Sequence, residues 1–222
     1  EAARLFQLAA NQGLAMAEYN LGVMYEDGTG VQRDMKQAAR FYQLAANQGY
    51  GLAQLELGIL YQNGTGVNKD ETEAVRLFRL AASQGLAQAE YKLGVMYANG
   101  MGVKKDEVEA VRFYQLSVNQ GFKNAEYNLG LMYANGTGVK QDAVEAVRLF
   151  KLAADKGLAI AEYNLGLMYE KGIGIEKDEK EAIRLYQLAA DQGGSPAHNR
   201  LAILYEEGKS VMQDYTKALQ LY

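Results

Sequence analysis

The feature that most constrains this chain is a short string, Leu-Gly-x-x-Tyr, which returns at a fixed interval. Its glycines lie 36 positions apart, at Gly22, Gly58, Gly94, Gly130 and Gly166. Units that recur in this way bury their apolar faces against their neighbours, so the chain grows by adding units to one array. The sequence therefore predicts a solenoid, an architecture whose long faces suit binding.

Other columns of residues keep the same interval. Tyrosines recur from Tyr25 to Tyr205, and aspartates recur from Asp34 to Asp214. The sixth unit also keeps the register, although Ala202 replaces the recurring glycine. We therefore predict an all-α fold in a single domain over residues 1–222, an α/α superhelical solenoid of about six 36-residue helix-loop-helix repeats.

The first helix of each unit, helix A, is indicated by its apolar spacing. Ala89, Leu93, Met96 and Tyr97 follow the i, i+4, i+7, i+8 pattern of one helix face. Gly94 lies in the middle of this helix, where glycine costs about 1 kcal/mol relative to alanine, so its recurrence predicts a close approach by the next helix. Helix A is predicted near residues 16–27, 52–63, 88–99, 124–135, 160–171 and 196–207.

The second helix, helix B, is indicated by a start signal and a stop signal. Asp106 is predicted to be its N-cap, with Glu109 completing a capping box, and Gly121 ends it. The recurring arginines of helix B, such as Arg112, are predicted to lie along the surface or to pair with neighbouring carboxylates. Helix B is predicted near residues 35–48, 71–84, 107–120, 143–156, 179–192 and 215–222.

Composition excludes several classes of function. The net charge of −4 argues against nucleic acid as a partner, because phosphate-binding surfaces are strongly basic. No run approaches the roughly 18 apolar residues of a membrane span. The chain has no cysteine and one histidine, His198, so it offers no thiolate or multi-histidine metal site, and we predict no cofactor and no enzyme activity. The lack of cysteine favours the cytosol and leaves the localisation open.

Both ends of the chain fall inside a repeat. Ala2–Phe6 aligns with Ala74–Phe78, and the last residues stop within the corresponding segment. We therefore expect the chain to be part of a longer protein. Leu219 and Leu221 require a covering helix, which predicts a homodimer through the exposed terminal helix.

The repeat closely resembles a known family. Residues 21–34 read LGVMYEDGTGVQRD, residues 38–49 read AARFYQLAANQG, and residues 15–22 follow A-x-A-E-Y-N-L-G. These motifs, which recur over essentially the whole chain, resemble the Sel-one-like repeat (SLR) family, a relative of the tetratricopeptide repeats with a longer loop. One departure is that Leu77 or Phe113 stands where the family usually has tryptophan in helix B.

The resemblance implies a superhelix in which A helices line the concave face and B helices the convex face. It also implies a scaffold that recognises partner proteins, so we predict that a partner protein or an extended peptide binds in the concave groove. An alternative is a structural spacer or self-assembling module that acts through its ends. A hydrolase of β-lactam type is a weaker alternative, because the Ser-x-x-Lys and Ser-Asp-Asn motifs of serine hydrolases are absent.

Aligning helix A with a tetratricopeptide unit at Leu21 and Gly22 places two columns on the groove side. Tyrosine offers a flat apolar ring with a hydroxyl, and asparagine can both donate to and accept from a peptide backbone. The opposing interpretation is that the tyrosines pack between A helices and the asparagines are merely solvated. The predicted partner-binding residues are Tyr19, Asn20, Tyr91, Lys92, Tyr127, Asn128, Tyr163, Asn164 and Arg200.

Charges along the same face suggest the character of the peptide. The groove margin carries more acidic than basic side chains, which favours a basic or mixed peptide. These side chains are Glu26, Glu170, Glu206 and Glu207, opposed by Lys92, Lys171 and Arg200.

Overall fold

A computed structural model describes residues 2–208 and 211–222 of the chain. Within these residues the structure contains thirteen α-helices and no strand, as the all-α prediction requires. None of the described helices is both long enough and apolar enough to cross a membrane. The helices are α1 (Ala2–Ala10), α2 (Ala15–Asp27), α3 (Met35–Asn47), α4 (Gly51–Asn63), α5 (Glu71–Ala82), α6 (Ala87–Asn99), α7 (Glu107–Asn119), α8 (Lys123–Asn135), α9 (Ala143–Asp155), α10 (Ala159–Lys171), α11 (Glu179–Asp191), α12 (Ser195–Glu207) and α13 (Tyr215–Leu221).

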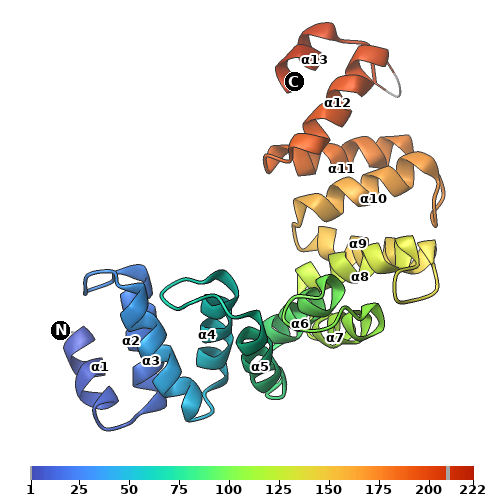
Figure 1. Cartoon of the computed structure of the whole chain (residues 1–222). Coiled ribbons are helices and arrows are strands. Elements are labelled where there is room, and N and C mark those ends of the chain that lie inside the picture. Colours follow the sequence, from blue (N-terminus) through green and yellow to red (C-terminus); the bar gives the residue numbers. More distant parts are fainter. Residues whose placement is uncertain (1, 209–210) are drawn as a thin grey trace. The chain divides into compact units, whose positions relative to one another are not determined.

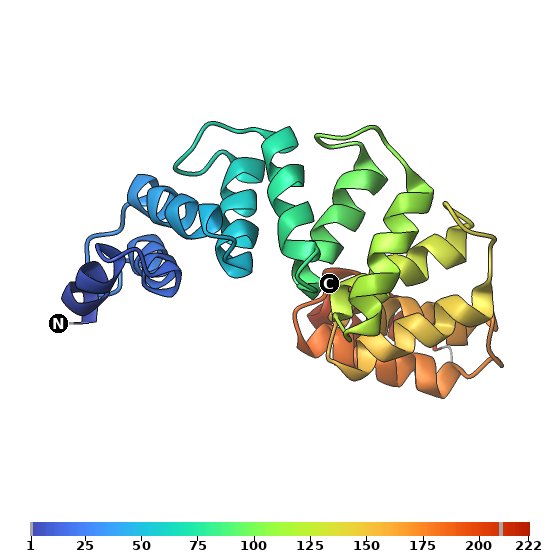
Figure 2. The same ribbon diagram turned by 90° about the horizontal axis from the view of Figure 1, so that it is seen from below.

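The helices form a repeat solenoid in two compact units. Unit 1 runs to Gln120 and contains α1–α7, and unit 2 runs from Gly121 and contains α8–α13. Inside each unit every helix packs against the next, and helices A and B of one repeat form an antiparallel hairpin, as α10 and α11 do (Figure 1). In unit 1 the loops that join α4 to α5 and α6 to α7 lie along the same edge (Figure 2).

The recurring glycine of helix A permits close packing inside each hairpin. A Cβ atom built at Gly94 would lie 2.5 Å from ring atoms of Tyr114 on α7, and one at Gly130 would lie 2.8 Å from the ring of Phe150 on α9. Real Cβ atoms essentially never come so close to another heavy atom. The prediction that a helix approaches these glycines is therefore confirmed.

Each described helix B from α3 onward begins at the predicted aspartate N-cap. In α7 the Asp106 carboxylate accepts hydrogen bonds from the backbone N–H groups of Val108 and Glu109 at 3.1 and 3.0 Å. The other aspartates that cap helix B in this way are Asp34, Asp70, Asp142, Asp178 and Asp214.

The predicted capping box, however, is wrong. The backbone N–H of Asp106, which Glu109 would have to accept, already donates to the carbonyl oxygen of Tyr97 at 3.0 Å. Glu109 pairs instead with Arg112 one turn later, at 2.8 Å. The same glutamate–arginine pair forms in α5, α9 and α11, which confirms the predicted pairing of the helix B arginines.

An apolar side chain precedes the first turn of most A helices. Tyr50 and Leu86 occupy this place before α4 and α6, and both pack against the core of unit 1. The Tyr50 ring lies 5.2 Å from the ring of Tyr19 on the preceding helix A. Before α12 the same place is taken by Gly194, which has no side chain to cover a neighbouring ring.

The terminal helix α13 carries large apolar side chains in solvent. Ala218 is buried and Leu221 packs, partly buried, against the core of unit 2, whereas Leu219 is 76% exposed and Tyr215 is 60% exposed. The homodimer through this helix stays a prediction.

Candidate partner-binding surface

The predicted site consists of two columns on the A helices. The first, which we call the tyrosine column, holds Tyr19, Leu55, Tyr91, Tyr127, Tyr163 and Asn199. The second, the amide column, holds Asn20, Glu56, Lys92, Asn128, Asn164 and Arg200. The first three members of each column belong to unit 1 and the last three to unit 2, so the two stretches are described separately.

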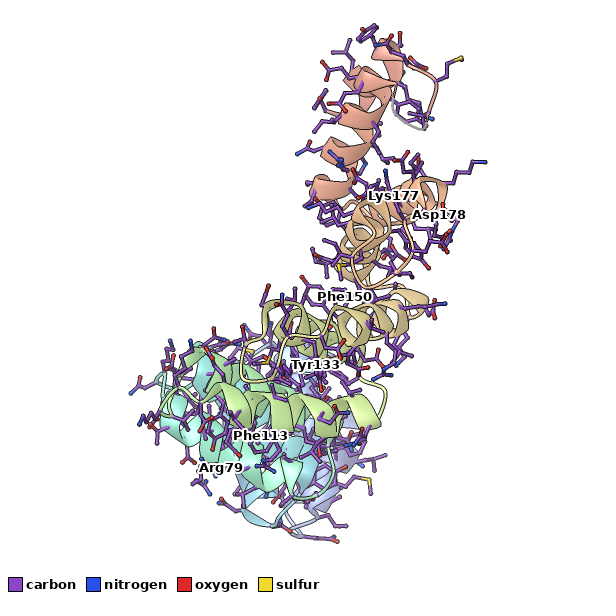
Figure 3. All side chains as sticks on the ribbon, turned by 90° about the vertical axis from the view of Figure 1, so that its right-hand side faces the viewer. Arg79, Phe113, Tyr133, Phe150, Lys177 and Asp178 are labelled. Atoms are coloured by element: carbon purple, nitrogen blue, oxygen red, sulfur yellow. The ribbon has the colours of Figure 1, made fainter. Side chains whose placement is uncertain are left out.

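The tyrosines of the first column are half-buried, and each packs on an aromatic ring of its own helix B. The centroid distances are 5.7 Å from Tyr19 to Tyr42 and 5.8 Å from Tyr127 to Phe150, which is labelled in Figure 3. Tyr91 and Tyr163 make the same contact at 6.0 and 5.7 Å. These rings are therefore braced against helix B while part of their surface stays accessible.

Two asparagines of the amide column, Asn20 and Asn164, are held by their own helices. The side-chain amide of Asn20 donates to the Met16 carbonyl at 2.8 Å, and that of Asn164 donates to the Ile160 carbonyl at the same distance. Asn164 also lies 3.5 Å from the hydroxyl of Tyr127, so the structure brings these two predicted residues together. The three asparagine residues of the column are half-buried, and their role in binding stays a prediction.

Opposite charges face each other in the amide column of unit 1. Burial raises the pKa of the Glu56 carboxyl, and the charge of Glu26 raises it further, whereas Lys92 acts in the opposite direction. Burial lowers the pKa of the Lys92 ammonium, and Glu56 opposes that shift. A ligand that approaches this stretch meets a carboxylate and an ammonium that are both half-buried.

In unit 2 the end of the amide column is organised around Glu170. Arg200 donates to both carboxylate oxygens of Glu170, and the Tyr186 hydroxyl donates to one of them at 2.6 Å. Burial alone would raise the pKa of Glu170, but the hydrogen bonds from Arg200 and Tyr186 outweigh it and hold that pKa below its ordinary value. The guanidinium of Arg200 is thereby fixed in place on the A-helix face.

An open groove of about 550 Å³, which we call the cavity, lies between α10 and α12 on this face of unit 2. Two predicted residues, Tyr163 and Arg200, lie in its wall together with Asn199 of the tyrosine column. Its volume falls within the roughly 300–1,000 Å³ typical of ligand pockets. The complete lining is Tyr163, Leu167, Lys171, Ser195, Pro196, Asn199, Arg200 and Ile203.

A row of polar pairs within the hairpins, each with a buried member on helix A and an exposed member on helix B, was not predicted from the sequence. One member lies in the first turn of helix A, and the other ends helix B 30 residues later, as Glu90 and Gln120 do at 2.7 Å. Both columns recur every 36 residues, a signal that the sequence contains. The remaining pairs are Glu18 with Gln48, Gln54 with Gln84, Glu126 with Lys156, and Glu162 with Gln192.

Burial raises the pKa of Glu90, whose side chain is only 5% exposed, and the hydrogen bond from Gln120 opposes this shift. The folded state thus holds the carboxyl proton more tightly than the unfolded state, whose pKa is near 4.5. The stability that this proton provides is complete below pH 4.5 and is lost as the pH rises through the folded-state pKa. Burial also raises the pKa of Glu18 and the pKa of Glu162.

We expect Glu90→Gln to raise the free energy of unfolding at pH 7, because glutamine stays neutral in this buried place. Gln54 occupies the equivalent position in α4, where its amide donates to the Ala46 carbonyl at 3.2 Å. The advantage of the variant should shrink toward pH 4.5, as measured by urea unfolding at several pH values. Glu176→Gln, which changes an exposed glutamate, is the control, and equal stability of Glu90→Gln and wild type at pH 7 would contradict the prediction.

Within the described residues no group of three or more histidine, cysteine, aspartate or glutamate side chains could hold a metal ion. His198, which takes the place of the buried glutamate in α12, lies with its ring Nδ1 3.1 Å from the Gly194 carbonyl oxygen.

Comparison with known proteins identifies the repeat. The Sel1 repeat family model matches seven consecutive segments: residues 1–14, 15–50, 51–86, 87–122, 123–158, 159–194 and 195–222. No curated protein matches the sequence. Proteins with Sel1 repeats generally act as protein-interaction scaffolds and are not a family of enzymes.

Solved structures show the same architecture. A protective antigen present in uropathogenic Escherichia coli strains, which displays an SLR fold, is 37% identical with a TM-score of 0.90. The match covers 98% of this chain but 46% of the antigen, so the chain spans about half of that relative. A Sel1 repeat protein from Oxalobacter formigenes is 34% identical over 95% of this chain and 84% of its own, with a TM-score of 0.88.

A more distant match supports the fold alone. The immunity protein Pa5087 from Pseudomonas aeruginosa is 24% identical with a TM-score of 0.56, over 93% of this chain and 81% of its own. Because the family model matches the repeats along the whole sequence and two solved relatives exceed 30% identity, the chain belongs to the Sel1 repeat family.

Proposed function

We propose that this chain is a protein-interaction scaffold that binds a partner protein or an extended peptide along the face formed by its A helices. The observation that carries the proposal is the tyrosine column, whose rings are braced by helix B and yet only half-buried. A ring that is already immobilised loses little conformational entropy when a partner packs on it.

The amide column supplies the polar part of the same proposal. Asn164 lies beside the hydroxyl of Tyr127, so a hydrogen-bonding group adjoins an aromatic surface. An extended peptide offers this combination in return, because its backbone donates and accepts hydrogen bonds while alternate side chains need apolar contacts. Charged members of the column, such as Lys92 and Arg200, would favour peptides with acidic side chains at the matching positions.

The test is selection of ligands from a displayed peptide library, followed by affinity measurement on variants of the A-helix face. We expect Asn128→Ala combined with Asn164→Ala to weaken selected peptides at least about tenfold. Tyr127→Phe removes only the hydroxyl and keeps the ring packed on Phe150. Weaker binding by this variant would therefore reflect a lost hydrogen bond to the peptide, because the fold is unchanged.

The matched control lies on the B helices of the same unit. Lys151→Ala and Lys180→Ala change exposed residues of α9 and α11 and should leave the affinity unchanged. Loss of binding in these variants, together with full binding by the A-helix variants, would place the partner on the B-helix face and contradict the proposal.

A further inference from the structure

The last repeat lacks two bulky side chains near the cavity between α10 and α12. Asn199 takes a place in the tyrosine column that is tyrosine in four other repeats and Leu55 in one. Gly194 takes the place held elsewhere by leucine, tyrosine or phenylalanine before helix A. In unit 1 the side chain at that second place, Tyr50, covers the ring of Tyr19 at 5.2 Å. Tyr163 has no such cover from Gly194.

The cavity therefore adjoins the place that an aromatic ring takes in other repeats. Its walls include the Tyr163 ring, Leu167, Pro196 and Ile203, which together form a mostly apolar surface. Tyr163 is itself braced on Tyr186 at 5.7 Å, so the wall is rigid. A planar ring that enters the cavity would pack against Tyr163 in the tilted or offset geometry that aromatic pairs prefer.

The charges at the cavity's rim indicate what should accompany the ring. Arg200 is bound to Glu170 through both carboxylate oxygens, so these two charges largely cancel. Lys171, the last residue of α10, is exposed and adds a second positive charge at the same rim. The position of Lys171 is asparagine in three other repeats, at Asn63, Asn99 and Asn135. The rim thus carries a net positive charge at Lys171.

We propose that this cavity is a specificity pocket for an aromatic side chain followed closely by a carboxylate, within an otherwise extended partner segment. The aromatic ring replaces the ring that Asn199 lacks, and the carboxylate lies beside Lys171. This inference rests on the proposed function, because it supplies one side-chain pocket along the A-helix face. It also narrows the partner from a mixed peptide to one with an aromatic–acidic element.

The test is a titration of the isotope-labelled protein with the peptide acetyl-GSGFDEGSG-amide, followed by NMR. We expect shifts at residues that line the cavity, and weaker binding by at least about tenfold when alanine replaces the phenylalanine. Replacing the two acidic residues of the peptide with lysine should weaken binding about two- to fivefold, as expected for an exposed ion pair. Lys171→Asn should produce a similar loss of affinity for the acidic peptide. In this variant the acidic and the lysine-containing peptides should bind with nearly equal affinity.

Two substitutions of Asn199 show whether a change in peptide binding comes from filling the cavity or from losing the asparagine side chain. Asn199→Tyr restores the residue of the other repeats and should abolish binding of the phenylalanine peptide, whereas Asn199→Ala leaves the cavity open and should retain it. Both change an exposed residue of α12, so circular dichroism should show an unchanged fold. Equal binding by Asn199→Tyr and wild type, or no binding to wild type at millimolar concentrations, would overturn the pocket assignment.

These outcomes are distinguishable from failure of the proposed function. If Asn199→Tyr has no effect while the Asn128 and Asn164 variants lose library-selected peptides, the pocket is wrong and the scaffold proposal stands. If the reverse holds, unit 2 binds ligands through the cavity alone, and binding along the whole A-helix face is refuted.

Discussion

Gly94→Ala should destabilise the protein by about 2 kcal/mol, although alanine is the better helix former. Helix propensity alone would favour the substitution by about 1 kcal/mol. The added Cβ, however, would lie 2.5 Å from two ring atoms of Tyr114, whose side chain is only 3% exposed and cannot withdraw into solvent. Overpacking a closed core typically costs about 1–3 kcal/mol and sometimes more. Urea unfolding followed by circular dichroism measures the difference.

Gly51→Ala is the matched control for this experiment. Gly51 also lies in an A helix, but the atoms nearest to its added Cβ belong to the ends of the flexible side chains of Gln84 and Leu86. Alanine already occupies the equivalent place in three repeats, at Ala15, Ala87 and Ala159. We expect this variant to change stability by less than about 1 kcal/mol. Equal effects at Gly51 and Gly94 would refute the assignment of Gly94 as a packing glycine.

The second large effect is expected at Lys156, which pairs with a buried carboxylate. The Glu126 side chain is 2% exposed, and Lys156 Nζ lies 2.5 Å from its Oε1 atom. The other carboxylate oxygen is buried without a hydrogen-bond partner in the described part of the chain. Lys156→Ala would remove the hydrogen bond and the ion pair of this carboxylate, although the charge of Arg148 would still act on it. We expect a loss on the order of 2–4 kcal/mol, moderated because Lys156 itself is 38% exposed.

Lys156→Gln tests whether charge or hydrogen bonding is required. Glutamine takes this place in the other pairs, for example at Gln120, where it donates to Glu90. We therefore expect Lys156→Gln to lose less than about 1 kcal/mol, since the donor is retained. The double variant Glu126→Gln with Lys156→Gln reproduces the Gln54–Gln84 pair and should recover any remaining loss. A Lys156→Ala protein as stable as wild type would show that the pair has no structural role.

Much of the fold could be predicted because its determinants are local or lie one repeat apart. The Asp106 cap, the packing role of Gly94 and the pairing of Arg112 with Glu109 all act within one hairpin. The same determinants recur every 36 residues, so each repeat supports the assignment of the others. The capping box failed for a reason that no local pattern contains, because the Asp106 N–H is engaged by the carbonyl of Tyr97 on the other helix.

The sequence was enough to predict which residues of the candidate site share a face. It was not enough to predict the side chains that these residues contact. Alignment placed Tyr163 and Arg200 on one face, and the structure places both in the wall of one cavity. It did not reveal that Tyr163 packs on Tyr186 or that Arg200 binds Glu170, because those contacts join residues 23 and 30 positions apart in different helices.

By itself, the sequence determined the repeat, its helices and the residues that face the same side, because periodic spacing converts directly into position on a helix. Only the tertiary structure decided which departures from the repeat matter. Leu55 also replaces a tyrosine of the column, yet it is 2% exposed and packed into the core of unit 1. Asn199 is polar and exposed, and it lies in the wall of the open space between α10 and α12. The physical reason is that a missing side chain leaves a cavity only where its neighbours cannot close the gap, and this depends on packing across helices.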